Sequence, residues 1–111
     1  MKVADIENWV DGETKVSGNP ETEIVDAYTS DLLSDVMGNA SADSVLITVQ
    51  GHKNTVAVAN LVGMPAIILC NGRSIPQDMQ ASAEKEGIAL FTTELNQFTT
   101  SYKIAQALNK K

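Results

Sequence analysis

The sequence predicts an α/β fold of three layers, in which helices cover both faces of a mostly parallel sheet. Three runs of consecutive apolar residues carry this prediction, near 45–49, 66–70 and 88–92. Each run has the length of a buried strand, and apolar residues at successive positions suit strands that are covered on both faces. Helical patterns separate the runs, and this alternation requires parallel crossover connections.

The amino-terminal segment has apolar residues at helical spacing. This spacing predicts a short amphipathic helix with Trp9 facing the core, and Gly12 marks its end. Residues 13–17 and 23–28 then read as short extended segments. Gly18-Asn19-Pro20 separates them as a turn, so they form either a small hairpin or two edge strands. The apolar residues of the first helix are Val3, Ile6, Trp9 and Val10.

Capping and turn residues delimit the later helices. Ser30 precedes one apolar helical face and offers its hydroxyl to the first free amides of that helix, which ends at Gly38 or Asn39. Pro76 opens and Gly87 closes a helix over residues 77–86. The apolar face after Ser30 consists of Leu32, Leu33, Val36 and Met37. We expect a further helix over residues 55–62, which ends before Gly63 and Pro65. The last predicted helix spans residues 98–108 and completes its layer with Phe98, Tyr102, Ile104, Ala105 and Leu108.

The length and composition limit the class of protein. The chain has 111 residues, one cysteine and one histidine, so we expect residues 1–111 to form one domain without a disulfide. Too few thiolates and imidazoles are present for a multi-cysteine or multi-histidine metal site, and we expect no metal or cofactor. Asp5 and Glu7 interrupt the first apolar residues, and no apolar run is long enough to span a bilayer. These features predict a cytoplasmic protein without a membrane partner.

Negative charge is concentrated in the first part of the chain. Residues 1–44 hold ten acidic and two basic side chains, whereas residues 45–111 hold four acidic and six basic ones, for a net charge of −6. A net negative chain repels a phosphate backbone, which argues against nucleic-acid binding. The acidic part either faces a basic partner or forms a solvated surface.

Polar loops follow the predicted strands, and the carboxyl ends of parallel strands meet at the edge where open α/β sheets bind ligands. Two loops combine glycine, Lys53 or Arg73, and a following helix N-terminus, which suits a phosphate or another anion. Alternatively, the glycines only supply tight turns, and Asn54 or Ser74 caps a helix. The candidate ligand-binding residues are Ser30, Asp31, Gln50, Gly51, His52, Lys53, Asn54, Asn71, Gly72, Arg73 and Thr92.

Two side chains raise the question of catalysis. Histidine is the side-chain type suited to proton transfer near neutral pH, and His52 is either an acid or base beside Ser30 or Asp31, or simply a hydrogen-bonding group. Cys70 is either a small apolar core residue or, near a helix N-terminus, a reactive thiol, and we favour the first. The chain lacks a hydrolase serine elbow, a phosphate-binding loop ending in Lys-Ser or Lys-Thr, and a dinucleotide-binding glycine pattern. These absences disfavour nucleotide hydrolysis and hydride transfer.

Several blocks of the chain resemble the DRTGG domain family. They are residues 28–37, 48–59, 67–73 and 87–93, in an order and spacing that cover essentially the whole chain. The eponymous letters are changed, because Gly51-His52-Lys53 stands at the Asp-Arg position and Cys70-Asn71-Gly72 at the Thr-Gly-Gly position. In this respect the chain resembles a stand-alone subgroup of the family. Such domains are similar to the amino-terminal domain of HPr kinase and occur beside CBS domains in pyrophosphatases and in phosphotransacetylases.

The resemblance implies regulation, not catalysis, and a homodimer. Our first hypothesis is therefore a non-catalytic regulatory, ligand-sensing or protein-interaction module that binds a nucleotide or other small anionic metabolite at its strand-end loops. Some small members of the family lie near iron hydrogenase components. The alternative is thus a docking or accessory subunit of a larger metabolic or redox complex of the hydrogenase type. A third hypothesis is a small enzyme that uses His52 as acid or base.

Overall fold

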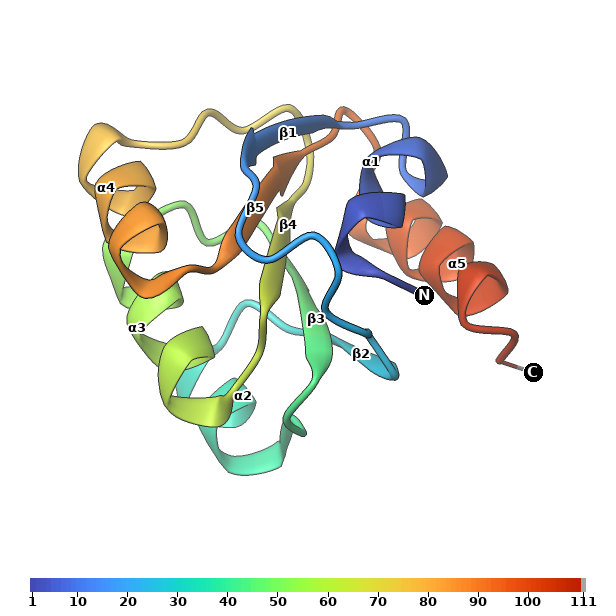
Figure 1. The fold of residues 1–111 in the computed structure, drawn as a ribbon, viewed down its shortest axis with the longest axis horizontal. Helices are drawn as coiled ribbons and strands as arrows, with labels where there is room; N and C mark the ends of the chain where they lie inside the picture. The colour runs from blue at the N-terminus through green and yellow to red at the C-terminus, as the bar shows by residue number, and fades with distance from the viewer. Residues whose placement is uncertain (111) are drawn as a thin grey trace.

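A five-stranded sheet forms the centre of the protein in the computed structural model, which describes residues 1–110 (Figure 1). The strand order is β1-β5-β4-β3-β2. Four neighbouring strands, β2 to β5, are parallel, and β1 is antiparallel to β5. The expected mostly parallel sheet is therefore confirmed. The strands are β1 (Glu13–Val16), β2 (Asp26–Thr29), β3 (Ser44–Thr48), β4 (Ala66–Leu69) and β5 (Ala89–Thr92).

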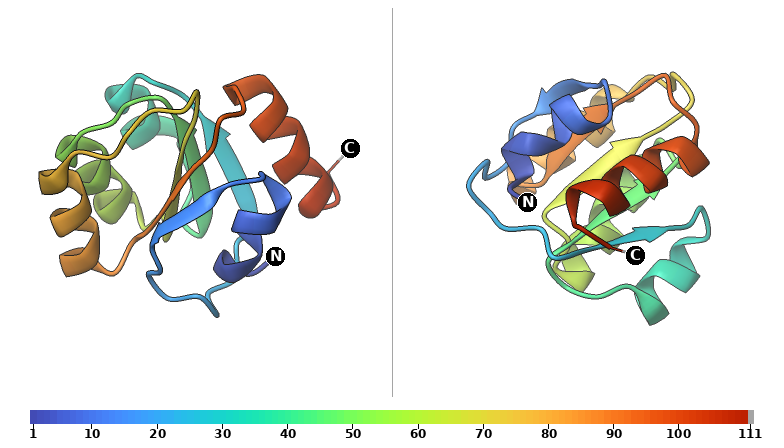
Figure 2. Two further views of the ribbon diagram at one scale, coloured as in Figure 1. Left: turned by 90° about the horizontal axis from the view of Figure 1, so that it is seen from above. Right: turned by 90° about the vertical axis from the view of Figure 1, so that its right-hand side faces the viewer.

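Helices cover both faces of this sheet, which confirms the three-layer α/β/α fold. Figure 2 shows α2, α3 and α4 on one side of the sheet, and α1 and α5 on the other. None of the helices within residues 1–110 has both the length and the apolar character needed to cross a membrane. The helices are α1 (Ile6–Trp9), preceded by a 3-10 turn (Val3–Asp5), α2 (Leu33–Asn39), α3 (Lys53–Val62), α4 (Gln77–Glu86) and α5 (Gln97–Ala107).

Successive residues of the central strands fill two separate cores. In β3, Val45 and Ile47 face the core beneath α1 and α5, whereas Leu46 faces the core beneath α3 and α4. All five residues of β3 and all four of β4 are buried. The apolar runs arise because successive side chains point to opposite faces of the sheet and helices shield both faces from solvent.

The two short amino-terminal strands do not form a hairpin. β1 pairs with β5 and β2 pairs with β3, so they are the two edge strands of the sheet. The chain between them crosses the amino-terminal end of β5, where a Cβ on Gly18 would lie 2.6 Å from the backbone nitrogen of Ala89. Gly18-Asn19-Pro20 therefore belongs to a crossing segment, and only the edge-strand alternative is confirmed.

The observed helices begin and end at or close to the residues predicted from capping and turn chemistry. α4 spans Gln77–Glu86 between Pro76 and Gly87, as expected, and Gly87 has a φ of 69°. α3 ends before Gly63, whose φ is 90°, but it starts at Lys53, two residues earlier than residue 55. α5 begins at Gln97 because Thr99 donates its backbone N–H to the side chain of Asn96.

Three predicted apolar faces are only partly buried, because each helix presents one narrow stripe to the core. Trp9 is 41% exposed, since Val10 takes the inward position after Ile6. On α2 only Val36 is buried, and both Met37 and the N-cap residue Leu32 are exposed.

The outer face of α5 carries an aromatic pair. Phe98 is 82% exposed and Tyr102 is 59% exposed, so they do not complete the helical layer as expected. The inward stripe is Thr100 and Ile104, and residues two positions earlier lie about 200° around the helix from it. We call Phe98 and Tyr102 the α5 aromatic pair.

Candidate functional site

The candidate residues lie at the carboxyl edge of the four parallel strands, as the topology requires. Ser30 and Asp31 follow β2, the loop from Gln50 follows β3, the loop from Asn71 follows β4, and Thr92 ends β5. Open parallel sheets bind ligands at this edge. The structure nevertheless separates these residues into groups with different surroundings.

Asp31 ties three elements together. Its Oδ1 accepts hydrogen bonds from Thr48 Oγ1 at 2.9 Å, from the Val49 backbone N–H at 2.9 Å and from Gln97 Nε2 at 3.0 Å. Its backbone carbonyl also accepts from Gln50 Nε2 at 2.9 Å. With three donors, Asp31 Oδ1 has no capacity for a further hydrogen bond. The first role of Asp31 is therefore structural, because it holds the end of β2 to the end of β3 and to α5.

Ser30 serves the start of α2. The Ser30 hydroxyl was expected to accept from the first free amides of the helix. It instead accepts from the backbone N–H of Leu32, the N-cap residue, at 3.2 Å. Hydrogen bonds from the hydroxyls of Ser30 and Tyr28 lower the pKa of the Asp35 carboxyl. Tyr28 Oη donates to Asp35 Oδ2 at 2.9 Å, and that bond raises the pKa of Tyr28.

His52 is exposed and is paired with a neutral side chain. Its Nε2 lies 3.0 Å from Gln50 Oε1. The loop beneath it is held by Thr55, whose Oγ1 donates to the Gln50 carbonyl at 2.8 Å. His52 is the N-cap residue of α3 but makes no side-chain cap, and Asn54 lies inside the first turn, so neither side chain caps α3. Within residues 1–110 no carboxylate forms an ion pair with the imidazole, so none orients it as a base.

The loop after β4 is a tight turn whose amides are already used. Asn71 donates its backbone N–H to the Leu95 carbonyl at 2.9 Å, and Gly72 donates its own to the Thr93 carbonyl at 2.9 Å. Both residues have positive φ, and a Cβ on Gly72 would clash with the carboxylate of Glu94. These two backbone N–H groups are therefore engaged within the protein, and the turn accounts for the glycine at position 72. Ser74 is no cap either, because Pro76 is the N-cap of α4.

Two free cations remain at this edge. Among the lysine and arginine side chains of residues 1–110, Lys53, Arg73 and Lys85 make no ion pair. Lys53 and Arg73 are both exposed; Lys53 is the first residue of α3, directly after the β3 loop, and Arg73 lies on the loop after β4. Lys85 lies in the last turn of α4. The carboxyl edge therefore carries two cations without an ion pair, beside the carboxylates of Asp31 and Glu94, in a chain of net charge −6.

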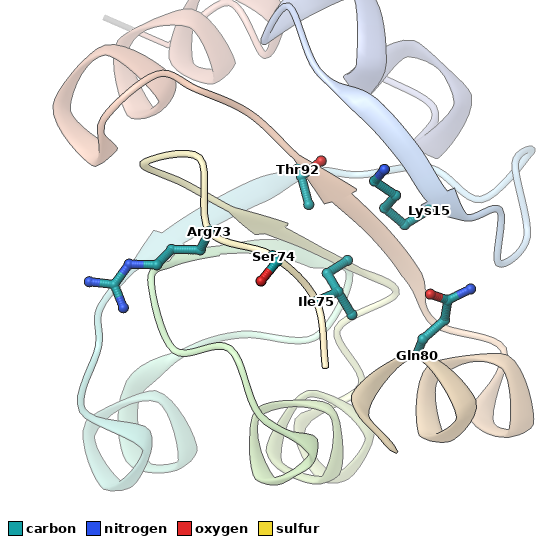
Figure 3. Close-up of a pocket in the computed structure, with 6 residues that line it drawn as sticks. All are labelled: Lys15, Arg73, Ser74, Ile75, Gln80 and Thr92. Carbon is teal, nitrogen blue, oxygen red and sulfur yellow. The ribbon is translucent and has the colours of Figure 1, made fainter. Parts of the chain in front are cut away.

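A pocket of about 280 Å³ opens beside Arg73 (Figure 3). It lies between β1, the end of β5, the loop after β4 and α4. Figure 3 shows Thr92 and Lys15 on one wall, Gln80 on α4, and the guanidinium of Arg73 directed away from them. Only Arg73 and Thr92 were candidates from sequence. The lining residues are Lys15, Arg73, Ser74, Ile75, Gln80 and Thr92.

The pocket residues that the sequence analysis missed have different origins. Ser74 and Ile75 directly follow Arg73, so extending that loop to Pro76 would have included them. Lys15 reaches the pocket only because β1 pairs with β5, which lies more than 70 residues further along the chain. No local pattern indicates that pairing.

Cys70 belongs to the core. Burial raises the pKa of its thiol, and Sγ donates to Thr100 Oγ1 at 3.5 Å. A thiol kept protonated in an apolar environment is a poor nucleophile, which supports the inert interpretation. Within residues 1–110, no group of three or more His, Cys, Asp or Glu side chains is placed to hold a metal ion.

The fold has a counterpart among solved structures. The chain superposes with a TM-score of 0.75 and 17% identity on the crystal structure of the CBS and DRTGG domains of the regulatory region of Clostridium perfringens pyrophosphatase, complexed with its activator diadenosine tetraphosphate. The match covers 96% of this chain and 48% of the other, so this chain spans about half of that region. This likeness supports a DRTGG-like fold. No protein-family profile and no curated protein matches the sequence.

Proposed function

We propose that this chain is a non-catalytic regulatory domain of the DRTGG family that senses a nucleotide or another small anionic metabolite. The observation that carries the proposal is the pair of unpaired cations, Lys53 and Arg73, at the carboxyl edge of the sheet. An anion bound there would gain charge-assisted hydrogen bonds without first breaking an internal ion pair of either side chain. The regulatory region with the similar fold was crystallised with a nucleotide activator.

The first prediction concerns Arg73. Titration calorimetry with AMP, ATP and diadenosine tetraphosphate should find at least one ligand, and Arg73→Gln should weaken it by about tenfold or more, because hydrogen bonds to charged groups contribute about 1.5–3 kcal/mol. Lys85→Gln is the matched control, since it also removes one unpaired charge but from the last turn of α4. Equal affinities for Arg73→Gln and wild type would remove Arg73 from the site.

The proposal excludes turnover of the bound ligand. His52 Nε2 lies beside Gln50 Oε1, and Asp31 Oδ1 accepts three hydrogen bonds, so these two atoms of the enzyme hypothesis are engaged in other contacts. Chromatography of each ligand after incubation with the protein should recover it unchanged. Ligand conversion that is lost in His52→Asn would favour the enzyme hypothesis instead.

We further propose that the domain acts as a homodimer through the α5 aromatic pair. Exposed aromatic side chains are typical of protein interfaces. The only charged residue in the described length of α5 is Lys103, so this face offers little repulsion between two acidic copies.

The second prediction tests this interface. Light scattering on the eluting protein should give a dimer mass for the wild type and a monomer mass for Phe98→Glu, because a charge at the centre of an apolar contact is costly to bury. Leu61→Glu is the matched control, since Leu61 is 70% exposed but lies on α3, across the sheet. A monomeric wild type that is captured by a partner through Phe98 would favour the alternative, a docking subunit of a larger complex.

A further inference from the structure

A β-bulge places Lys15 beside the pocket. Thr14 pairs with Phe91 and Val16 pairs with Leu90, so Lys15 is the extra residue on β1. A bulge turns a side chain away from the regular alternation of a strand and often occurs next to functional sites. Here it brings an ammonium group to the wall that also contains Thr92. The pocket thus receives a cation that does not come from the strand-end loops.

The charge of Lys15 is only loosely held. Its Nζ lies 2.8 Å from Glu13 Oε2, and the side chains of Lys15 and Glu13 are 40% and 74% exposed. The hydrogen bond from Lys15 lowers the pKa of the Glu13 carboxyl. An exposed ion pair of this kind is weak, so another anion can replace Glu13. Arg73, across the pocket mouth, has no ion pair to break among the described residues.

The remaining lining identifies the chemistry of an occupant. Ser74 and Thr92 offer hydroxyl groups, Gln80 an amide and Ile75 one apolar surface. Together with an ammonium and a guanidinium, these donors match the several acceptor oxygens of a phosphate. The volume of about 280 Å³ is just below the range of about 300–1,000 Å³ for sites that enclose a drug-sized molecule. It accommodates one phosphate group and leaves the rest of a larger ligand outside.

We propose that this pocket is the phosphate subsite of the domain. In the bound state the Lys15 ammonium pairs with the ligand phosphate in place of Glu13, and the Arg73 side chain rotates from the loop after β4 to contact the same phosphate. The inference rests on the proposed function and locates the charged group between β5 and α4, instead of over the loop of His52 and Lys53. Inorganic phosphate and the phosphate of a nucleoside monophosphate share this chemistry.

The test measures the affinity of the intact chain for AMP, inorganic phosphate and adenosine by calorimetry. We expect AMP to bind most tightly, phosphate more weakly and adenosine least. Lys15→Gln should weaken AMP and phosphate by tenfold or more, whereas Glu13→Gln should tighten both two- to fivefold, because the competing carboxylate is removed. A variant that merely disturbed β1 would not tighten binding, so the opposite signs exclude a structural effect.

The outcomes separate this inference from the proposed function. If AMP binding is lost in Lys53→Gln and kept in Lys15→Gln, the phosphate lies over the loop after β3 and the inference is wrong, although the proposed function stands. Equal binding of adenosine and AMP would also overturn the inference. If neither AMP, ATP, diadenosine tetraphosphate nor phosphate binds the wild type, both proposals are wrong. Lys85→Gln, with its charge in the last turn of α4, is again the control.

Discussion

Gly18→Ala is expected to lower the free energy of unfolding by about 2–4 kcal/mol, because backbone strain adds to a steric clash. Gly18 has a φ of 58°, and its Cβ would lie 2.6 Å from the backbone nitrogen and 3.0 Å from the Cα of Ala89. Ala89 is the first residue of β5 and is fully buried, so it cannot shift without moving the sheet. Thermal melts should show a fall in Tm of about 10–20 °C.

Two other glycines separate strain from clash. Gly87 has a φ of 69° but no atom within 4 Å of a Cβ, so Gly87→Ala should cost only the strain of about 1–2 kcal/mol. Gly38 lies inside α2 with open space around it, and Gly38→Ala should raise the stability by up to about 1 kcal/mol. A Gly18→Ala melt that coincides with that of Gly87→Ala would show that the chain crosses β5 less closely than the structure indicates.

Asp31→Ala is expected to destabilise the protein by about 2–4 kcal/mol, because it leaves donors without an acceptor. Thr48, whose hydroxyl donates to Asp31, is fully buried, and the Val49 amide and the Gln97 side chain lose the same oxygen. β2 is an edge strand with a single neighbour, so the loss should loosen β2 and α2 together. Urea unfolding with hydrogen exchange of the β2 amides measures both effects.

The control for this prediction is Asp31→Asn. It keeps a side-chain oxygen in the same position and removes only the charge, so we expect a loss of about 1 kcal/mol. The pair distinguishes a structural role of Asp31 from a role in ligand binding. If Asp31→Ala unfolds like the wild type but fails to bind AMP, the residue belongs to the ligand site and not to the framework.

Most helices and strands could be predicted from short stretches of the sequence. Pro76 and Gly87 delimit α4 because proline suits a helix start and glycine tolerates the positive φ that ends a helix. The strands β3, β4 and β5 follow from short, mostly apolar runs, since a strand buried on both faces is apolar at nearly every position. Their parallel order then places the strand-end loops at one edge.

Helix faces were predicted less well. Phe98 and Tyr102 are apolar and share a face of α5, yet the inward stripe consists of Thr100 and Ile104. Thr100 is buried, and its hydroxyl accepts a hydrogen bond from Cys70, a contact that no sequence pattern reveals. The choice between two partly apolar faces depends on the rest of the core and not on the helix itself.

The three-layer class, the central parallel strands and the loops at their carboxyl edge could be predicted from local patterns, because periodicity and turn chemistry act over a few residues. The pairing of β1 with β5, which brings Lys15 to the pocket with Arg73 and Thr92, became visible in the folded chain alone. The same holds for the internal use of the amides of Asn71 and Gly72. Such pairings join residues far apart in the chain, and their stability comes from burying both partners together, which no local pattern encodes.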